Sequence, residues 1–226
     1  MGTFTLSKTN RLFWLGRYVE RAYIAIQLME RAYDELIDNP VFDYQGYCAR
    51  LNISSQGYQG AEDFVRSYLF SPDNADSAAT ALSRAFDNAV VLRETVGSTT
   101  LSYIQLAVNT MEKAPISLAP MLDLQDVRDY LMAFKGCVDD YITDTDSRMI
   151  IKIGMSVERI DMSLRLEYQV EELEHQFERL SSRLQRTRIR RDGKYLRLLI
   201  DLMPSPDPLE NKELLLECIE NLFPDA

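Results

Sequence analysis

Apolar residues recur every three or four positions along most of the chain, as they do in α-helices that bury one face. The clearest stripe lies within residues 8–38 and comprises Leu12, Leu15, Val19, Ala22, Ile26, Met29, Tyr33 and Leu36. The first half of this segment is also apolar on its other side, through Phe13, Trp14, Ile24, Ala25 and Leu28. A helix that is apolar nearly all round is typical of the centre of a fold.

Breaks in this pattern divide the chain into a series of helices. Ser7 or Thr5 is the expected N-cap of the first helix, and Asn39-Pro40 is expected to end it. Further helices are predicted over residues 61–70, 76–96, 98–113, 124–143, about 146–188 (with room for a break), 195–203 and 208–223, the last with Asp207 as N-cap. Residues 41–59 are expected to form loops or short turns, and residues 114–121 a connection. No segment alternates polar and apolar residues as a strand would, so we predict an all-α, multi-helix bundle.

Two of the long helices carry the same short motif. Leu15-Gly16-Arg17-Tyr18-Val19-Glu20-Arg21 resembles Ile153-Gly154-Met155-Ser156-Val157-Glu158-Arg159, and both contain Gly-x-x-Val-Glu-Arg. A glycine inside a helix costs about 0.5–1 kcal/mol relative to alanine, so it is expected to have a packing reason. We predict that Gly16 and Gly154 lie where the two helices cross. The chain is expected to form a single domain, 1–226, with two pseudo-equivalent halves, about 1–120 and 121–226.

The composition of the chain limits the kinds of partner and compartment that we expect. The formal net charge of −10 disfavours nucleic acid as a partner. The three cysteines lie far apart without a C-x-x-C pair, which fits a reducing compartment and argues against a zinc site or disulfide framework. No apolar run approaches the ~20 residues of a membrane span, and the first ten residues do not resemble a signal peptide. We therefore expect a cytoplasmic protein with no membrane association.

The Glu-Arg pairs are the main candidate for chemistry, because a charge on an apolar helix face must be paired or exposed. In one interpretation the pairs are structural, with Glu20 bound by Arg159 or Arg93 and Glu158 bound by Arg21. In the other, arginines of the motifs clamp a carboxylate or phosphate. The candidate cluster comprises Arg17, Glu20, Arg21, Asn88, Arg93, Glu94, Glu158, Arg159 and Asp161.

Other chemistries find little support. His175 is the only histidine, which disfavours a dimetal site or a histidine-based triad, and no glycine-rich phosphate loop occurs. We predict no metal and no cofactor. A basic stripe at spacings of four, three and four is predicted on one helix face and comprises Arg179, Arg183, Arg186 and Arg190. It is either a solvated face or a docking surface for an acidic partner or another subunit.

The residues of the two motifs also carry a family resemblance. Residues 12–22, residues 153–165 and, more weakly, residues 85–94 are similar to the signatures of the alpha-E domain, a bacterial helical family named for its Glu-Arg motif. Tyr23 stands where that family typically has an acidic residue. The resemblance implies companions of two kinds, circularly permuted ATP-grasp ligases and transglutaminase-like proteins. It leads us to expect an accessory or scaffold protein of a peptide ligation or modification system. An enzyme of unknown reaction with an anion pocket lined by the Glu-Arg helices, and a helical oligomerisation scaffold, are the alternatives.

Overall fold

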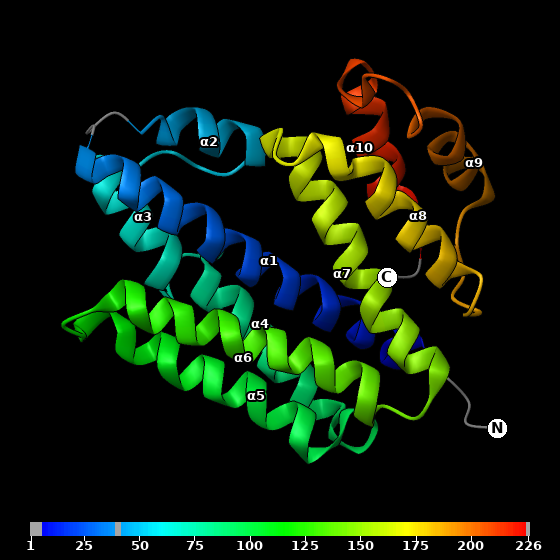
Figure 1. Cartoon of the computed structure of the whole chain (residues 1–226), viewed down its shortest axis with the longest axis horizontal. Coiled ribbons are helices and arrows are strands. Elements are labelled where there is room, and N and C mark those ends of the chain that lie inside the picture. Colours follow the sequence, from blue (N-terminus) through cyan, green and yellow to red (C-terminus); the bar gives the residue numbers. More distant parts are fainter. Residues whose placement is uncertain (1–5, 39–41, 225–226) are drawn as a thin grey trace. The chain divides into compact units, whose positions relative to one another are not determined.

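The computed structural model describes residues 6–38 and 42–224, and within them the chain is all-α (Figure 1). The prediction of a multi-helix, all-α fold is therefore confirmed. The α-helices are α1 (Leu6–Asp38), α2 (Tyr44–Leu51), α3 (Ala61–Phe70), α4 (Ala78–Val91), α5 (Arg93–Lys113), α6 (Pro120–Tyr141), α7 (Thr145–Leu166), α8 (Leu173–Leu184), α9 (Gly193–Leu202) and α10 (Lys212–Asn221). Over these same residues, none of the helices has the length and apolar character needed to cross a membrane.

The chain forms two compact units. The first consists of Met1–Arg17 and Thr143–Ala226, and the second of Tyr18–Ile142. The start of α1 thus belongs with α7–α10, and the rest of α1 belongs with α2–α6. The pseudo-equivalent halves 1–120 and 121–226 stay a prediction, and the two units begin and end at other residues.

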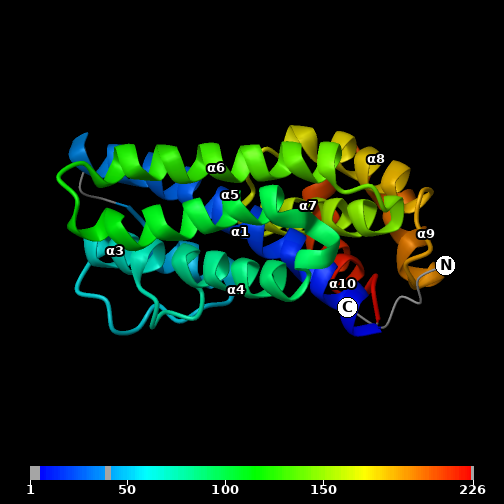
Figure 2. The same ribbon diagram turned by 90° about the horizontal axis from the view of Figure 1, so that it is seen from below.

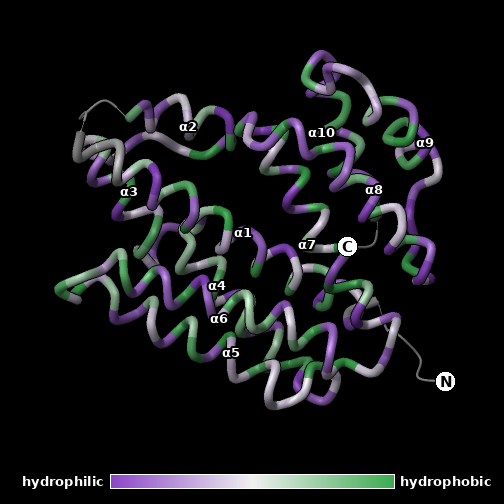
Figure 3. The backbone as a smooth tube through the Cα atoms, viewed as in Figure 1, coloured by the Kyte–Doolittle hydropathy of each residue, from purple (hydrophilic) through white to green (hydrophobic). Residues whose placement is uncertain are grey.

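In the second unit, α5 and α6 run side by side, α4 packs against α5, and α3 packs against α4 (Figures 1 and 2). Apolar and polar residues alternate around these helices (Figure 3), and the apolar faces meet in the core. Its largest fully buried side chains include Phe64, Leu82, Ile104, Leu131 and Phe134. These buried positions follow the three- and four-residue spacing seen in the sequence.

In the first unit, α7 is the central helix. It packs against α8 and α10, and α10 packs against α9. Nearly every residue of α7 from Met149 to Leu164 is buried, as a helix that is apolar on several sides requires. Arg183 ties α8 to α7, since its Nη1 donates a hydrogen bond to the carbonyl of Lys152 at 2.8 Å and another to the hydroxyl of Ser156. The ring of Phe13 on α1 lies 5.1 Å from that of Phe223.

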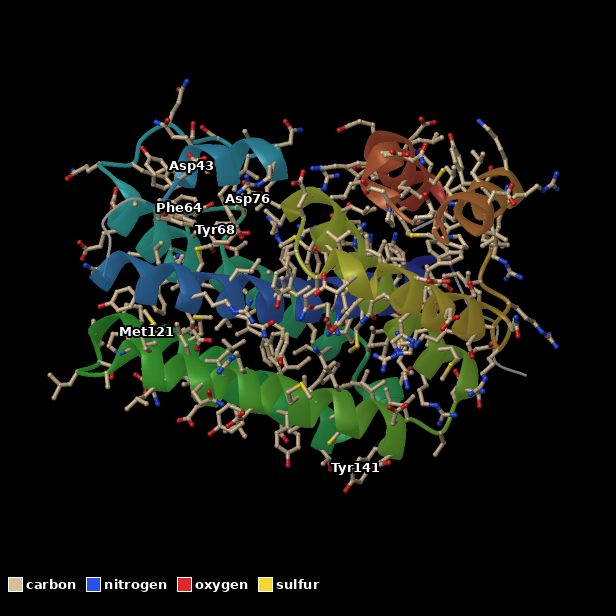
Figure 4. The ribbon with its side chains drawn as sticks, turned by 45° about the horizontal axis from the view of Figure 1, so that its top comes forward. Asp43, Phe64, Tyr68, Asp76, Met121 and Tyr141 are labelled. Carbon is tan, nitrogen blue, oxygen red and sulfur yellow. The ribbon has the colours of Figure 1, made fainter. Side chains whose placement is uncertain are left out.

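One helix was missed, because residues 41–59 are not all loop. Asp43 caps α2 by accepting a hydrogen bond from the backbone of Gly46 at 2.9 Å. Tyr47 of α2 packs its ring against Phe64 and Tyr68 of α3, at 5.7 and 5.5 Å. Figure 4 labels Asp43, Phe64 and Tyr68 in this region. Aromatic packing therefore holds a two-turn helix that is too short to show periodicity.

Several predicted boundaries also need correction. The helix expected over 76–96 ends at Val91, and Gly97 (φ 78°, ψ 158°) kinks the start of α5. The long segment 146–188 contains two helices, because Glu167 (φ 53°) ends α7 in the left-handed conformation and α8 ends at Leu184. Ser7 lies inside α1 and is not its N-cap, while Thr5 and Asn39-Pro40 lie outside the described residues. The Asp207 cap is confirmed by its bond from the backbone of Leu209 at 3.0 Å, although the first turn after it is a 3-10 helix.

Candidate functional site

The two repeated glycines lie at a helix crossing in the first unit. A Cβ atom on Gly16 of α1 would stand 2.0 Å from the carbonyl oxygen of Ile151, and one on Gly154 of α7 would stand 2.1 Å from that of Phe13. Each glycine therefore contacts the residue that lies three positions before the other glycine, as in a pseudo-two-fold arrangement. No side chain fits between these backbones. The prediction that the two motif-bearing helices pack directly against each other is confirmed.

This close approach brings a buried ion pair together. Glu158 of α7 is fully buried, and Arg17 Nε donates a hydrogen bond to its Oε2 at 2.6 Å. The Arg17 guanidinium also lies 5.0 Å from the centre of the Trp14 ring, where a cation–π interaction supports it. The sequence had suggested Arg21 for this carboxylate. The crossing explains why Arg17 is the partner. Its backbone nitrogen would lie 3.1 Å from a Cβ atom on Gly154, and Gly154 precedes Glu158 by one turn of α7.

A second buried carboxylate follows one turn later on α7. Asp161 is 4% exposed, and Arg165 Nε lies 3.2 Å from each of its carboxylate oxygens. Burial raises the pKa of Asp161, and the neighbouring charge of Glu158 raises it further, while Arg165 and Arg17 lower it in part. Arg165 also donates to Glu220 of α10. A row of alternating charges thus connects α1, α7 and α10 within the first unit.

The carboxylate of the other motif has a different partner. Glu20 is 1% exposed, and its Oε2 lies 2.8 Å from Nζ of Lys135 on α6, within the second unit. The same ammonium stands 3.9 Å from the centre of the Tyr23 ring. Tyr23 therefore supplies an aromatic face to this cation. Lys135 was not among the predicted residues, although its place on the apolar stripe with Leu131 and Val138 is the signal that could have identified it.

The residues of the predicted cluster belong to both units. Arg17, Glu158, Arg159 and Asp161 lie in the first unit, and Glu20, Arg21, Asn88, Arg93 and Glu94 in the second. Arg93 is mostly exposed and pairs with its neighbour Glu94 at 3.4 Å, so the suggested pairing of Arg93 with Glu20 is wrong. Arg21, Asn88 and Arg159 are half-buried. A role for any of these residues in binding an anion stays a prediction.

The basic stripe does not exist as a helix face. Of its four members, Arg179 is exposed on α8 and Arg183 turns inward onto α7, whereas Arg186 and Arg190 follow the end of that helix at Leu184. Beyond the end of α8, Thr187 and Ile189 are buried, and their spacing of two does not fit one face of a helix. The prediction of a single helical stripe is therefore wrong, and the arginines beyond Leu184 form a different surface.

Metal-binding side chains do not gather in the part of the chain that the structure describes: no group of three or more His, Cys, Asp or Glu there could hold an ion. His175 is exposed on α8, with its Nδ1 3.5 Å from Glu178. The three cysteines, Cys48, Cys137 and Cys218, are buried and free, and burial raises the pKa of each thiol.

Comparison with known proteins also points to the Glu-Arg motif. One family model matches residues 6–188, and it describes a predicted α-helical domain with a conserved ER motif, that is, Glu-Arg. The match includes both motifs, Glu20-Arg21 and Glu158-Arg159, and ends close to the end of α8. No curated protein matches the chain, and no solved structure does.

Proposed function

We infer, from the premise that this chain belongs to the Alpha-E family, that it is an accessory helical protein of a bacterial peptide ligation or modification system that depends on an ATP-grasp enzyme. The partner we propose is a circularly permuted ATP-grasp protein, with a transglutaminase-like protein as the other companion. The chain would bind and position this machinery in the cytoplasm without carrying out the ligation itself.

The proposal rests on the ion pairs that the motif carboxylates form within the fold. Glu158 is satisfied by Arg17 at 2.6 Å, and Glu20 by Lys135 at 2.8 Å, each in a buried or nearly buried setting. A cation committed to a buried carboxylate has less capacity to clamp a free anion. The Glu-Arg motifs therefore support a rigid helical framework better than they support an anion-binding pocket.

A surface feature also supports a role in protein contacts. The connection between α5 and α6 and the first turn of α6, in the second unit, expose three apolar side chains: Ile116 is 89% exposed, Leu118 106% and Leu122 71%. Met121, labelled in Figure 4, marks this end of α6. A cluster of exposed apolar residues is typical of an interaction surface.

The direct test mixes the purified chain with a purified circularly permuted ATP-grasp protein from the same host. We expect one complex in size-exclusion chromatography with light scattering, and a change in the ATP turnover of the enzyme when the chain is added. Two separate peaks and unchanged turnover would contradict the proposal. Light scattering on the chain alone separates this role from the oligomerisation scaffold, since a scaffold of that kind forms a stable homo-oligomer without the enzyme.

A second candidate is an enzyme, and the observation in its favour is Asp161. Its raised pKa, beside Glu158 and Arg17, is the kind of perturbation found in general acids and bases. Asp161→Asn preserves the shape of the side chain and removes its titration. If the chain has its own activity, this variant should abolish it while leaving the ATP-grasp complex intact. If the unmodified chain has no activity of its own and the variant no longer forms the complex, Asp161 has a structural role instead.

A further inference from the structure

The connection between α8 and α9 carries an unusual arrangement of arginines. Arg186, Arg188 and Arg190 are exposed, and the residues between them, Thr187 and Ile189, are buried at 9% and 8% exposure. Residues 187–192 form neither helix nor turn. Exposure of every second side chain is typical of an extended chain with one face inward. We call residues 186–190 the arginine segment.

One hydrogen bond within this segment and two from the residues that follow it restrain its path. The backbone nitrogen of Ile189 donates to Thr187 Oγ1 at 3.3 Å, and that of Asp192 donates to the carbonyl of Leu222 at 2.9 Å. The guanidinium of Arg191 donates to the carbonyl of Leu184 at 3.4 Å, across the segment. Because Thr187 and Ile189 are buried, the arginines between and beside them are held on the outward face before any partner arrives. Side chains two residues apart in an extended chain are about 6.5–7 Å from each other.

The charge of this region differs from that of the whole protein. Residues 179–197 contain eight arginines and lysines and a single acidic residue, Asp192, whereas the whole chain has a net charge of −10. A local basic surface on an acidic protein attracts an acidic partner and repels other basic surfaces. The arginine segment contains no aromatic residue on which a base could stack, which favours a peptide over a single-stranded nucleic acid.

We propose that the arginine segment is a docking surface for an extended, acidic segment of a partner protein, with a carboxylate at every second residue. In such a peptide the carboxylates lie on one face at the same spacing as the arginines, so each can accept a charge-assisted hydrogen bond from one guanidinium. The inference rests on the proposed accessory role, because a docking surface requires a partner. It deepens that role by assigning it a site and a ligand chemistry.

Fluorescence anisotropy with two labelled peptides tests the proposal on the full chain. One peptide alternates glutamate and serine, and the other has the same length and composition with its glutamates in adjacent pairs. Only the first can present all of its carboxylates on one face. We expect the alternating peptide to bind about tenfold more tightly than the paired one, a difference of about 1.4 kcal/mol. We also expect its affinity to fall as salt is added.

Charge reversal identifies the surface. The double variant Arg186→Glu/Arg188→Glu should lose binding of the alternating peptide, while Arg66→Glu, a change at an exposed position on α3, should keep it. Thermal melts confirm that each variant is folded. If the reversed variant melts early, Arg186→Gln/Arg188→Gln takes its place and should still weaken binding.

Three results would overturn the inference: no binding of the alternating peptide, equal binding of both peptides, or equal loss of binding in Arg66→Glu. Tighter binding of a single-stranded RNA than of the alternating peptide would overturn it as well. Formation of the ATP-grasp complex is measured separately. If that complex forms and the peptide does not bind, only the docking surface fails; if the peptide binds and no complex forms, the assignment of the partner fails.

Discussion

The two Glu-Arg motifs are alike in sequence and differ in the cation that each carboxylate uses. Glu158 is bound by Arg17, the residue that follows the repeated glycine of the first motif. The residue that follows the glycine of the second motif is Met155, which carries no charge. Glu20 takes its cation from Lys135 on α6 instead. Both cations lie against an aromatic ring, Trp14 for Arg17 and Tyr23 for Lys135.

This difference teaches that the glycine crossing and the buried carboxylates are separate requirements. The crossing is set by backbone contact and repeats on both helices. The ion pair needs only a cation within reach, and different elements can supply it. Tyr23 illustrates the same freedom, because it supports the lysine through the face of its ring.

The largest expected effect is from Glu158→Ala. This change would leave the Arg17 guanidinium, whose side chain is 13% exposed, without the carboxylate that accepts its hydrogen bond. We expect the free energy of unfolding to fall by about 3–5 kcal/mol, measured by chemical denaturation at neutral pH. A loss below about 1 kcal/mol, which is typical of an exposed pair, would show that the Arg17–Glu158 pair is not structural.

Glu20→Ala should cost less, about 1–3 kcal/mol in the same measurement. The ammonium of Lys135 can reach water along its flexible stem more readily than a planar guanidinium can. Lys135→Met, which removes this cation from Glu20, is the companion variant. If Glu20→Ala cost as much as Glu158→Ala, the distinction that we draw between the two motifs would not hold.

Gly16→Ala tests the crossing separately from the charges. Its Cβ would overlap the backbone of Ile151, which cannot give way without moving a helix. We expect a loss of about 1–3 kcal/mol. Gly136→Ala is the matched control, since a Cβ there meets nothing within 4 Å, and it should stabilise α6 by about 0.4–1 kcal/mol. Equal effects of the two substitutions would contradict the close contact.

The smallest effect concerns pH. Because the pKa of Asp161 is raised in the folded protein, the folded state binds more protons than the unfolded chain between the ordinary aspartate pKa and the raised value. The stability that this group contributes is therefore present at low pH and is lost as the pH rises through that window. The total loss in the free energy of unfolding is about 1.4 kcal/mol for each unit by which the folded pKa exceeds the unfolded pKa. Asp161→Asn lacks this titration. As the pH rises through the window, the free energy of unfolding of the variant should increase relative to that of the unmodified protein. If the two proteins show parallel plots of unfolding free energy against pH, the pKa of Asp161 is not raised.

Sequence periodicity predicted the helical class, the helix at 61–70 and the crossing at Gly16 and Gly154, because each depends on local spacing or on a glycine with a packing reason. It could not predict which cation meets each buried carboxylate. That choice depends on tertiary placement, and Lys135 is more than a hundred residues from Glu20 in the chain. The predicted basic stripe was wrong because α8 ends at Leu184, and Thr187 and Ile189 beyond it are buried by the tertiary fold.

The central claim is that the buried Arg17–Glu158 ion pair stabilises the fold, and a double-mutant cycle on these two residues tests it most directly. Arg17→Ala, Glu158→Ala and the double variant are unfolded in denaturant at neutral pH, and the coupling energy is taken from the three losses. The account predicts that the double variant loses less than the sum of the single variants, with a coupling of about 1–3 kcal/mol. Losses that add to within about 0.5 kcal/mol would show that the two residues do not stabilise each other, and would contradict the claim.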